Sequence, residues 1–351
     1  MDNNITPTKK RRPPFPKART SLIIYNPVSG VWQNKNNLFD LIMSISERGE
    51  GSIVKMTTAK GDAQKIVRQY GPYVDRIICC GGDGTLHEAI EGLYTAGLHV
   101  PIGYIPIGTT NDFAATLDIP FDFHAACENT LQGRPCPLDI GTIKGRTGTA
   151  GIGTPASDGS EVRTLSAVPD AGSRVVFDYI ACFGIFTRTS YETDQALKNT
   201  IGYLAYLLNG VTELADLGNP IRMRVESSSR LFDQDFCFGA VVNSYTVAHF
   251  FKLPQEEVNL ADGEFEVLLI NQPQNIFEAH DTAQAILSGD YANPRIHFFH
   301  SDKIRFVSDD PVKWCADGEF AGEFTDVEVE NHNHAVDILL ADHDNWEETE
   351  E

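Results

Sequence analysis

The sequence predicts an α/β domain followed by an all-β domain: an N-terminal domain built on a parallel sheet, and a C-terminal antiparallel domain that resembles a β-sandwich. Two observations lead to this prediction. From residue 21 to about residue 138, strand-like apolar runs alternate with helix-like segments, which is the pattern of βαβ units. Beyond residue 172, most apolar runs are β-branched or aromatic and are bounded by turn residues. The 351 residues, 42% of them hydrophobic, are enough for a core in each domain.

The N-terminal domain is expected to contain strands and helices in alternation. The strands are predicted at 22–27, 52–58, 76–80 and 101–107, and the helices at 36–46, 62–70 and 86–94. Cys79 and Cys80 are adjacent in the third strand, so their side chains should point to opposite faces of the sheet as small core residues. Ligands of such sheets bind at the carboxyl ends of the strands. The turns that follow the strands are therefore where a site is expected.

The C-terminal domain is expected to be rich in strands, with helical segments only at 195–217 and 275–287. Its strands are predicted at 173–184, 221–227, 235–244, 263–270, 295–300, 303–308, 326–330 and 335–340. Residues 145–172 are rich in Gly, Thr and Ser without a hydrophobic period, which is typical of an inserted surface loop. We therefore predict a disordered basic arm at 1–20, the α/β domain at 21–138 completed by 335–351, and the β-rich domain at 139–334.

Charge and composition exclude several classes of protein. A net charge of -21 repels phosphate backbones, so nucleic acid is not an expected partner. No window reaches the roughly 18 apolar residues of a membrane span, so no transmembrane segment is expected. The opening residues lack the apolar core of a secretory signal and the seven cysteines follow no pattern, which predicts a cytoplasmic protein. The basic arm is expected either to be a solvated tail or to touch an anionic membrane surface.

The segment ICCGGDGTLHEAIEGL, residues 78–93, carries the strongest local signal. Three glycines surround Asp83 where an apolar strand gives way to a helix. Glycines let backbone amides approach an oxyanion, and the helix N-terminus adds a partial positive charge, so this glycine turn suits a phosphate group. Thr85 and Glu88 fit a capping box, which predicts that the helix begins where the glycines end. Asp83 would repel a phosphate unless a divalent cation or a proton donor lies between them, so it implies magnesium or proton transfer.

Two further polar turns that contain glycine follow neighbouring strands. They read NPVSG at 26–30 and GTTNDFA at 108–114. In a parallel sheet these turns should converge with the glycine turn at one edge. The sequence contains neither the Walker A pattern nor the Rossmann dinucleotide pattern, so those two phosphate-binding classes are excluded.

The motifs YNPVSG, TTAKGDA, GGDGTLHEAI and PIGTTNDFA, in this order and spacing, resemble the catalytic domain of the diacylglycerol kinase family. This family includes bacterial lipid kinases and the sphingosine and ceramide kinases. The resemblance extends from about residue 21 to residue 340, through FDYIACFG, GYLAYLLNGV, LADGEFEVLLI and CADGEF. GGDGT together with GTTNDFA is specific to the family, whereas GGDG alone is shared with NAD kinases and phosphofructokinases. The resemblance implies ATP- and Mg²⁺-dependent phosphorylation of a lipid hydroxyl, with diacylglycerol converted to phosphatidic acid.

The resemblance also implies roles for individual residues. The implied ATP-binding residues are Asn26, Pro27, Ser29, Gly30, Thr57, Gly81, Gly82, Asp83, Gly84, Thr85, Leu86, His87, Thr109 and Asn111. The implied general base is Asp317, with Glu319 near the metal and Asp83 organising metal and water. A regulatory or structural magnesium would be held by Asp262, with Asn259 and Glu264 as further ligands through their carbonyls.

The triplet Asp-Gly-Glu occurs twice, at 262–264 and at 317–319, and its context separates the two copies. The first runs directly into the apolar strand FEVLLI, as the metal turn of the family does. The second follows VKWCA and leads into FAGEF, as the catalytic turn does. Each triplet is also compatible with a plain hairpin turn, because Asp-Gly is a common turn dipeptide. The cysteine in CADGE and the 145–172 loop depart from the family pattern, and both departures bear on the lipid site rather than the nucleotide site.

Other functions stay open at the level of sequence: a sphingoid-base or other lipid kinase, an NAD kinase-like enzyme, or a catalytically silent regulator that binds lipid or nucleotide. GTTNDFA and the strand-rich second domain count against an NAD kinase. The presence of Asp83, Asp317 and Glu319 counts against a silent regulator. The expected partner is a lipid substrate at the membrane surface, with peripheral association during turnover, and a homodimer is the assembly left open.

Overall fold

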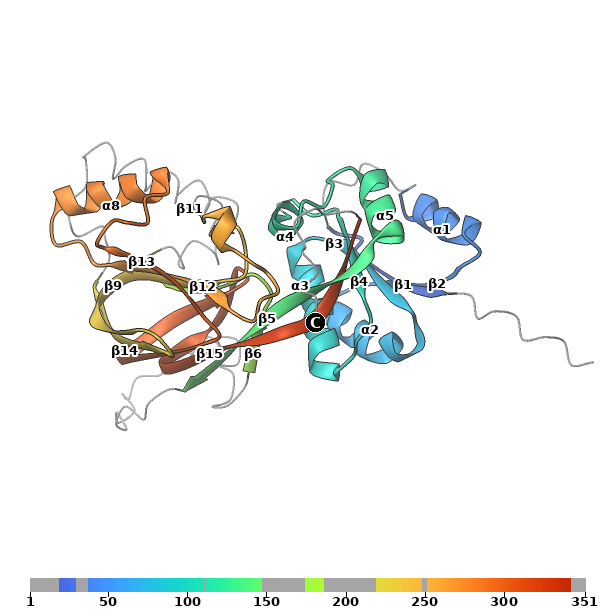
Figure 1. Ribbon diagram of the computed structural model, residues 1–351. Helices are drawn as coiled ribbons and strands as arrows, with labels where there is room; N and C mark the ends of the chain where they lie inside the picture. Colours follow the sequence, from blue (N-terminus) through green and yellow to red (C-terminus); the bar gives the residue numbers. More distant parts are fainter. Residues whose placement is uncertain are drawn as a thin grey trace, which may run out of the picture.

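The computed structural model describes residues 19–29, 37–109, 111–146, 174–185, 219–247 and 251–341. The basic arm up to residue 18, Gly30, the insertion beyond residue 146 and the helix predicted at 195–217 lie outside these residues. Two lobes lie side by side, one rich in helices and one rich in strands, and long strands run from one into the other (Figure 1).

The helix-rich lobe is built around four strands that pair in the order β4-β3-β1-β2, all of them parallel. In chain order its elements are β1 (Thr20–Tyr25), α1 (Asn37–Glu47), β2 (Gly51–Met56), α2 (Asp62–Tyr70), a 3₁₀ turn (Gly71–Tyr73), β3 (Arg76–Gly81), α3 (Asp83–Ala96), β4 (Ile102–Pro106), α4 (Asp112–Thr116) and α5 (Phe123–Gln132). Because β1, β3 and β4 are parallel neighbours, their carboxyl ends meet at one edge of the sheet.

Strand β3 lies at the centre of this lobe and is buried along its whole length. Ile77 and Cys79 pack into one hydrophobic cluster, whereas Ile78 and Cys80 pack into another. The prediction that the two cysteines face opposite sides of the sheet is therefore confirmed. A strand covered on both faces needs an unbroken apolar run, which is what residues 77–80 supply.

The strand-rich lobe continues the same sheet. Its elements are β5 (Arg134–Arg146), β6 (Arg174–Phe177), β7 (Ile180–Gly184), β8 (Ile221–Ser227), β9 (Leu231–Val242), β10 (Thr246–Val247), β11 (Phe251–Lys252), a 3₁₀ turn (Gln255–Glu257), β12 (Phe265–Asn271), α8 (Ile276–Ser288), β13 (Ile296–Ser301), β14 (Lys303–Ala316) and β15 (Glu319–Leu340). The predicted β-rich second part is present. Its described strands, apart from the β10–β11 pair, join those of the first lobe in one thirteen-stranded sheet, where a separate sandwich was expected.

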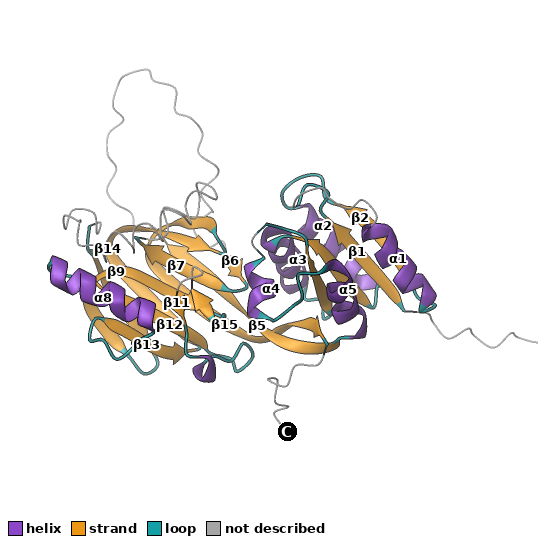
Figure 2. Ribbon diagram, turned by 90° about the horizontal axis from the view of Figure 1, so that it is seen from above, coloured by secondary structure: helices purple, strands orange, loops and turns teal. Residues whose placement is uncertain are grey.

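Two long strands explain this continuity. β15 has 22 residues and replaces the two strands predicted at 326–330 and 335–340. It pairs with β14 near its start and with β4 at Ile338, so one strand passes through both lobes. β5 runs antiparallel beside it over most of that path, as Figure 2 shows. At about 3.3 Å per residue, a strand of this length reaches on the order of 70 Å, enough to cross both lobes.

The hydrophobic core also crosses the junction. One cluster joins Leu22 and Tyr104 of the helix-rich lobe to Leu138, Ala240 and Ile338. A second cluster, around Trp314, lies within the strand-rich lobe. Apolar burial therefore stabilises the junction between the lobes as well as each lobe.

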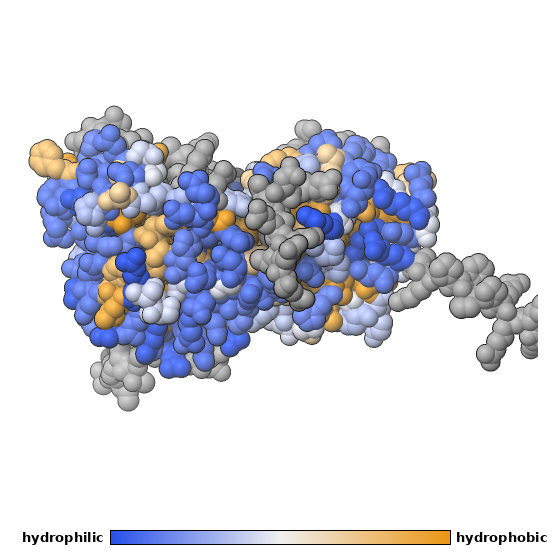
Figure 3. Space-filling view, in the orientation of Figure 1, coloured by the Kyte–Doolittle hydropathy of each residue, from blue (hydrophilic) through white to orange (hydrophobic). Residues whose placement is uncertain are grey.

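The outer surface is hydrophilic over most of the face seen in Figure 3, with apolar atoms in smaller patches. Among the described residues, no helix combines the length and apolar character needed to cross a bilayer.

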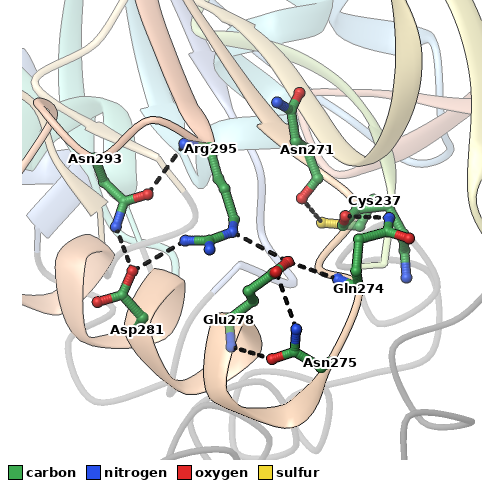
Figure 4. A network of polar contacts seen from close by, with 9 residues as sticks. Cys237, Asn271, Gln274, Asn275, Glu278, Asp281, Asn293 and Arg295 are labelled. Atoms are coloured by element: carbon green, nitrogen blue, oxygen red, sulfur yellow. Dashed lines mark hydrogen bonds and ion pairs between the residues drawn. The ribbon is translucent and has the colours of Figure 1, made fainter.

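Helix α8 shows how a local sequence signal fixes an element on the strand-rich lobe, and the helix predicted at 275–287 is confirmed. Asn275 accepts a hydrogen bond from the backbone N–H of Glu278 (3.0 Å), and its amide donates to Glu278 Oε1 (2.9 Å). Arg295, which precedes β13, donates to Glu278 (3.3 Å) and Asp281 (3.0 Å), as Figure 4 shows. The helix start is thus capped by its own residues and held against the neighbouring strand.

Replacing Asn275 with alanine should lower the free energy of unfolding by about 1 kcal/mol, because the backbone N–H of Glu278 loses its acceptor. Asn275→Ser retains a capping oxygen and should remain within a few tenths of a kcal/mol of the wild type. Urea denaturation monitored by circular dichroism measures both values. Equal stability of the alanine and serine variants would show that the cap does not contribute.

Candidate active site

Three turns meet at the carboxyl edge of the parallel strands. The amide of Asn26, after β1, donates to the hydroxyl of Thr85 on α3 (2.9 Å). A Cβ atom placed on Gly82, after β3, would lie 3.3 Å from Gly108 Cα, after β4, and 3.4 Å from the hydroxyl of Ser29. The structure therefore brings these segments of NPVSG, GGDGT and GTTNDFA into direct contact.

Glycine is required where the second and third turns touch. A Cβ on Gly108 would lie 2.5 Å from Gly82 Cα and 2.6 Å from Asn111 Oδ1, and a backbone atom cannot give way. Gly108→Ala should therefore destabilise the protein by about 1–3 kcal/mol, the usual cost of overpacking. Gly84→Ala is the matched control, because its Cβ would have no atom within 4 Å. Chemical denaturation should separate the two variants, and equal midpoints would contradict the close approach of the turns.

Helix α3 begins differently from the prediction. It starts at Asp83 with Gly82 as its N-cap, and Gly82 has no side chain to cap the helix. Thr85 therefore lies inside the helix, where it accepts from Asn26, and the predicted capping box is wrong. Glu88 instead accepts from the backbone N–H groups of Gly61 (2.7 Å) and Ala63 (3.1 Å), at the start of α2. A carboxylate at this helix start is stabilising, so Glu88 caps the neighbouring helix instead of its own.

Asp83 holds the third turn in place. Its carboxylate accepts hydrogen bonds from the backbone N–H groups of Asp112 (3.1 Å) and Phe113 (3.2 Å) at the start of α4. Asn111 precedes them in a left-handed conformation (φ 55°), and its side-chain oxygen accepts from Gly108 N (3.0 Å). Burial raises the pKa of Asp83, against the opposing effect of these amides. Burial and the charge of Asp83 raise the pKa of Asp112 to about 7.

Asp317 lies at the junction of the two lobes. Asp317 and Gly318 form the tight turn between β14 and β15, and both have positive φ (47° and 82°). Its Oδ2 accepts from the backbone N–H of Asp178 (2.8 Å), and its Oδ1 accepts from Tyr179 (3.1 Å) and Ile180 (3.0 Å) at the start of β7. The carboxylate is thus fixed by the backbone of the adjacent strand.

His87 of α3 reaches across to the same place. Its Nδ1 lies 2.6 Å from Asp178 Oδ1 and 2.9 Å from Asp317 Oδ2. These three residues form the one group of at least three His, Cys, Asp or Glu side chains with ligand atoms within 4.8 Å that the described part of the chain contains. The imidazole connects the helix that begins at the glycine turn to the predicted general base.

The ionisation states within this cluster follow from burial and charge. Burial lowers the pKa of His87, but the two carboxylates outweigh it and hold that pKa well above its ordinary value. Burial and the negative charge of Asp317 raise the pKa of Asp178. Burial acts to raise the pKa of Asp317 as well, but the hydrogen bonds from Asp178 and His87 keep it below its ordinary value.

The charges of four carboxylates act on the buried hydroxyl of Tyr179. Burial raises its pKa, and the charges of Asp317, Asp112, Asp83 and Asp178 raise it further. Such a concentration of negative charge favours a divalent cation or bound protons at this junction.

Glu319 is placed near this junction but is exposed. Its carboxylate forms an ion pair with the ammonium group of Lys60 in the turn before α2 (2.6 Å). This contact joins the two lobes on the outer side of the turn that contains Asp317. Both side chains are more than half exposed, so the pair contributes little to stability.

The predicted magnesium residues lie on a separate turn before β12. Asn259 Oδ1 accepts from Ala261 N (3.1 Å), Asp262 Oδ1 accepts from Glu264 N (3.0 Å), and all three predicted ligands are exposed. The turn is anchored by the fully buried Asp139 of β5, which accepts from Gly263 N (2.7 Å). The structure does not bring these residues together with Asp317 in the cluster around His87.

The remaining predicted nucleotide residues fall into two groups. Partly or fully exposed positions are Asn26, Pro27, Ser29, Gly82, Gly84 and Thr109. Buried positions are Thr57, Gly81, Thr85, Leu86 and Asn111. Leu86 packs its side chain into the core, so only its backbone is available to a ligand.

Sequence reasoning missed Asp178 and Lys60. Asp178 is a single acidic residue within the apolar run VVFDYIACF, and a charged residue in such a run is a recognisable signal. Lys60 is the one basic residue of the motif TTAKGDA, and that charge is the signal that could have found it.

Comparison with known proteins finds related sequences. Residues 20–143 match the sequence model of the family described as the diacylglycerol kinase catalytic domain. A diacylglycerol kinase of Bacillus subtilis is 29% identical over 321 residues, covering 90% of this chain and 95% of that protein. A diacylglycerol kinase of Staphylococcus aureus is 27% identical and covers 86% of each chain.

Solved structures show the same fold. A crystal structure of a putative diacylglycerol kinase from Bacillus anthracis aligns over 93% of this chain and 99% of that chain, with a TM-score of 0.70 at 18% sequence identity. A second structure of a diacylglycerol kinase from that organism aligns with a TM-score of 0.66 at 17% identity. The chain is therefore similar to diacylglycerol kinases over most of its length, and its residues 20–143 match the sequence model of their catalytic domain.

Proposed function

We propose that this protein is an ATP- and magnesium-dependent lipid kinase that transfers the γ-phosphoryl group to the hydroxyl of a diacylglycerol, giving phosphatidic acid. The observation that carries the proposal is the junction of the lobes, where α3 begins in the glycine turn and reaches Asp317 through His87 within 2.9 Å. A phosphate site at the start of this helix and a buried carboxylate in contact with His87 of the same helix supply the two parts that phosphoryl transfer to an alcohol requires. The relatives that this chain matches over most of their length are named diacylglycerol kinase, which supports diacylglycerol as the proposed acceptor.

The glycine turn is the proposed phosphate site. Gly84 has open space where a side chain would lie, and the first N–H groups of α3 point out of a partially positive helix end. The proposed nucleotide contacts are the side chains and backbone of the three converging turns, together with Thr57. Positioning of the phosphates against the carboxylate is the main contribution that the protein makes to such a reaction.

Asp317 is the proposed proton acceptor. As the lipid oxygen attacks the γ-phosphorus, its proton passes to Asp317, and the bond from the γ-phosphorus to the bridging oxygen of ADP breaks. The hydrogen bonds from the backbone of 178–180 keep the carboxylate in place during this transfer. We assign Asp83 to holding the third turn beside the phosphates, and Glu319 to the contact between the lobes through Lys60.

Magnesium fits the donor atoms that the chain offers. Asn259, Asp262 and Glu264 present oxygen atoms, the ligand type that Mg²⁺ prefers, so this turn would hold a structural ion. The acidic junction around Tyr179 suits a second cation bound with the nucleotide. When bound there, magnesium supplies positive charge that offsets the negative charge of the phosphates.

The proposed location is the cytoplasmic face of a membrane, with peripheral association during turnover. The proposed domains are the α/β part at 21–138 with 335–351, and the β-rich lipid-binding part at 139–334. A diacylglycerol remains in the bilayer, so the protein must meet it at the surface.

The test uses purified full-length protein, γ-labelled ATP and mixed micelles that contain a diacylglycerol, a sphingoid base or a ceramide, with NAD in a separate reaction. We expect organic-phase label with diacylglycerol, and its loss when EDTA removes magnesium. Label on a sphingoid base or ceramide alone would replace the proposed acceptor. Label on NAD alone, or on no acceptor, would reject the lipid kinase.

A further inference from the structure

His87 has geometry that its predicted role in nucleotide binding does not explain. Its Nδ1 faces two carboxylates of the other lobe, at 2.6 Å from Asp178 and 2.9 Å from Asp317. The His87 side chain is 20% exposed, whereas those of Asp178 and Asp317 are only 2% and 4% exposed. The primary interaction of the His87 imidazole is therefore with these two buried carboxylates and not with a nucleotide.

The contact distances indicate shared hydrogen bonds rather than a shared metal ion. Two ligands of one tetrahedral zinc ion, each at about 2.0–2.1 Å from it, lie about 3.3 Å apart. The 2.6 Å separation of His87 Nδ1 and Asp178 Oδ1 is too short for that arrangement and matches a charge-assisted hydrogen bond. One N–H group therefore lies between two acceptors.

The hydrogen bonds of Asp317 show what the imidazole adds. A carboxylate has about four acceptor sites on its two oxygens. Backbone amides of residues 178–180 fill three of them, and all three belong to the strand-rich lobe. His87 contacts Oδ2 from the helix that begins at the glycine turn, and the side chain of Asp178 shares a further hydrogen bond with the same carboxylate. The imidazole is thus the contact that orients the carboxylate relative to the phosphate site.

We propose that His87 is a positioning residue for Asp317. Its Nδ1–H holds the carboxylate against the glycine turn. When the substrate hydroxyl arrives, the imidazole gives up its contact with Oδ2 and stays hydrogen-bonded to Asp178. The backbone donors are fixed by strand β7, so the imidazole contact is the one that the incoming hydroxyl replaces. Asp178 is the second acceptor that keeps the imidazole in place during this exchange. The substrate proton then moves to Asp317 Oδ2 as its oxygen bonds to the γ-phosphorus. This inference rests on the proposed function, because it assigns a residue to that reaction.

Two variants of His87 separate positioning from simple packing. His87→Asn keeps an N–H donor near the place of Nδ1, whereas His87→Leu keeps bulk but removes the donor. We expect His87→Leu to lower kcat by about 100-fold, within the range of a lost acid–base contribution. The Kd for ATP should remain within about threefold, and His87→Asn should recover at least about tenfold of the lost kcat.

Three results would overturn the proposal: unchanged kcat in His87→Leu, an ATP Kd that rises in proportion to the loss of kcat/KM, or equal kcat in both variants. Thermal unfolding of each variant checks that it is folded. If His87→Leu does not fold, Asp178→Asn tests the same proposal. Asp178→Asn should lower kcat and leave ATP binding intact, and wild-type kcat in this variant would count against the proposal.

An NMR measurement keeps this inference distinct from the proposed function. The Nδ1–H of His87 should give a downfield, exchange-protected proton signal in the wild type, and the signal should shift in Asp317→Asn. This expectation holds whether or not a lipid is phosphorylated. Absence of the signal would reject the hydrogen bond itself, whereas absence of lipid phosphorylation with the signal present would reject only the proposed reaction.

Discussion

Asp317→Asn is expected to lower lipid phosphorylation by about 10²–10⁴-fold, the range that a general base contributes, while ATP binding persists. The variant cannot accept a proton as a carboxylate does. In the wild type, Asp317 accepts hydrogen bonds from the backbone at 178–180 and faces His87. The NH₂ group of an asparagine side chain can only donate, so it would face some of these donors without forming a hydrogen bond. At least one buried donor then loses its partner, so the free energy of unfolding should fall by about 1–3 kcal/mol.

Steady-state kinetics at saturating lipid, with ATP affinity measured separately, tests this prediction. Asp326→Asn is the matched control, because Asp326 lies on the same strand β15 and its carboxylate pairs with Arg305 at the surface. The control should retain wild-type turnover. Full activity in Asp317→Asn would reject Asp317 as the proton acceptor and leave its turn a structural hairpin.

Glu266→Gln is expected to change how stability depends on pH. Glu266 lies on β12, is 2% exposed, and its Oε2 has no hydrogen-bond partner within the described segments. Burial, reinforced by the charges of Asp262 and Asp139, raises its pKa from 4.5 to about 9. The folded protein thus keeps a proton on Glu266 at pH values where the unfolded chain has lost it.

Because the folded state binds this proton more tightly than the unfolded state, stability falls as the pH rises. The stability that the protonated group contributes is fully present below pH 4.5 and is lost as the pH rises toward 9. Between these limits the free energy of unfolding falls by about 1.4 kcal/mol per pH unit on account of this one group. Glutamine has no proton to lose, so the slope in Glu266→Gln should be shallower by that amount.

Urea denaturation at pH 6, 7 and 8 measures the slope for each protein. Over this interval the wild type should lose close to 3 kcal/mol more than Glu266→Gln. Glu264→Gln is the matched control, since Glu264 is exposed at the start of the same strand and should leave the slope unchanged. Identical slopes in the wild type and Glu266→Gln would show that Glu266 is ionised in the folded protein.

The parts that could be predicted from sequence are those fixed by nearby residues. The run of apolar residues in β3, the glycine turn after it and helix α8 with its Asn275 cap all depend on signals within a few positions. The partnership of Asn111 with Gly108 is local in the same way. Such features need only the residues that form them.

The parts that could not be predicted depend on pairs far apart in the chain. His87 meets Asp178 across 91 positions, and no pattern within either segment encodes the contact. Pairing of β15 with β4 at Ile338 and Ile102 turned two expected sheets into one. The capping box predicted for Glu88 on α3 is wrong, because tertiary packing places its carboxylate at the start of α2. Contacts between distant residues thus determine which partner each of these side chains has and which strands pair.

The most direct test of the central claim is transfer of label from γ-labelled ATP to a diacylglycerol in mixed micelles, by wild-type protein and by Asp317→Asn. The proposed function predicts labelled phosphatidic acid with the wild type, and a loss of at least about 100-fold in the variant with ATP binding retained. Labelled NAD without labelled lipid, or equal lipid labelling by both proteins, would contradict it.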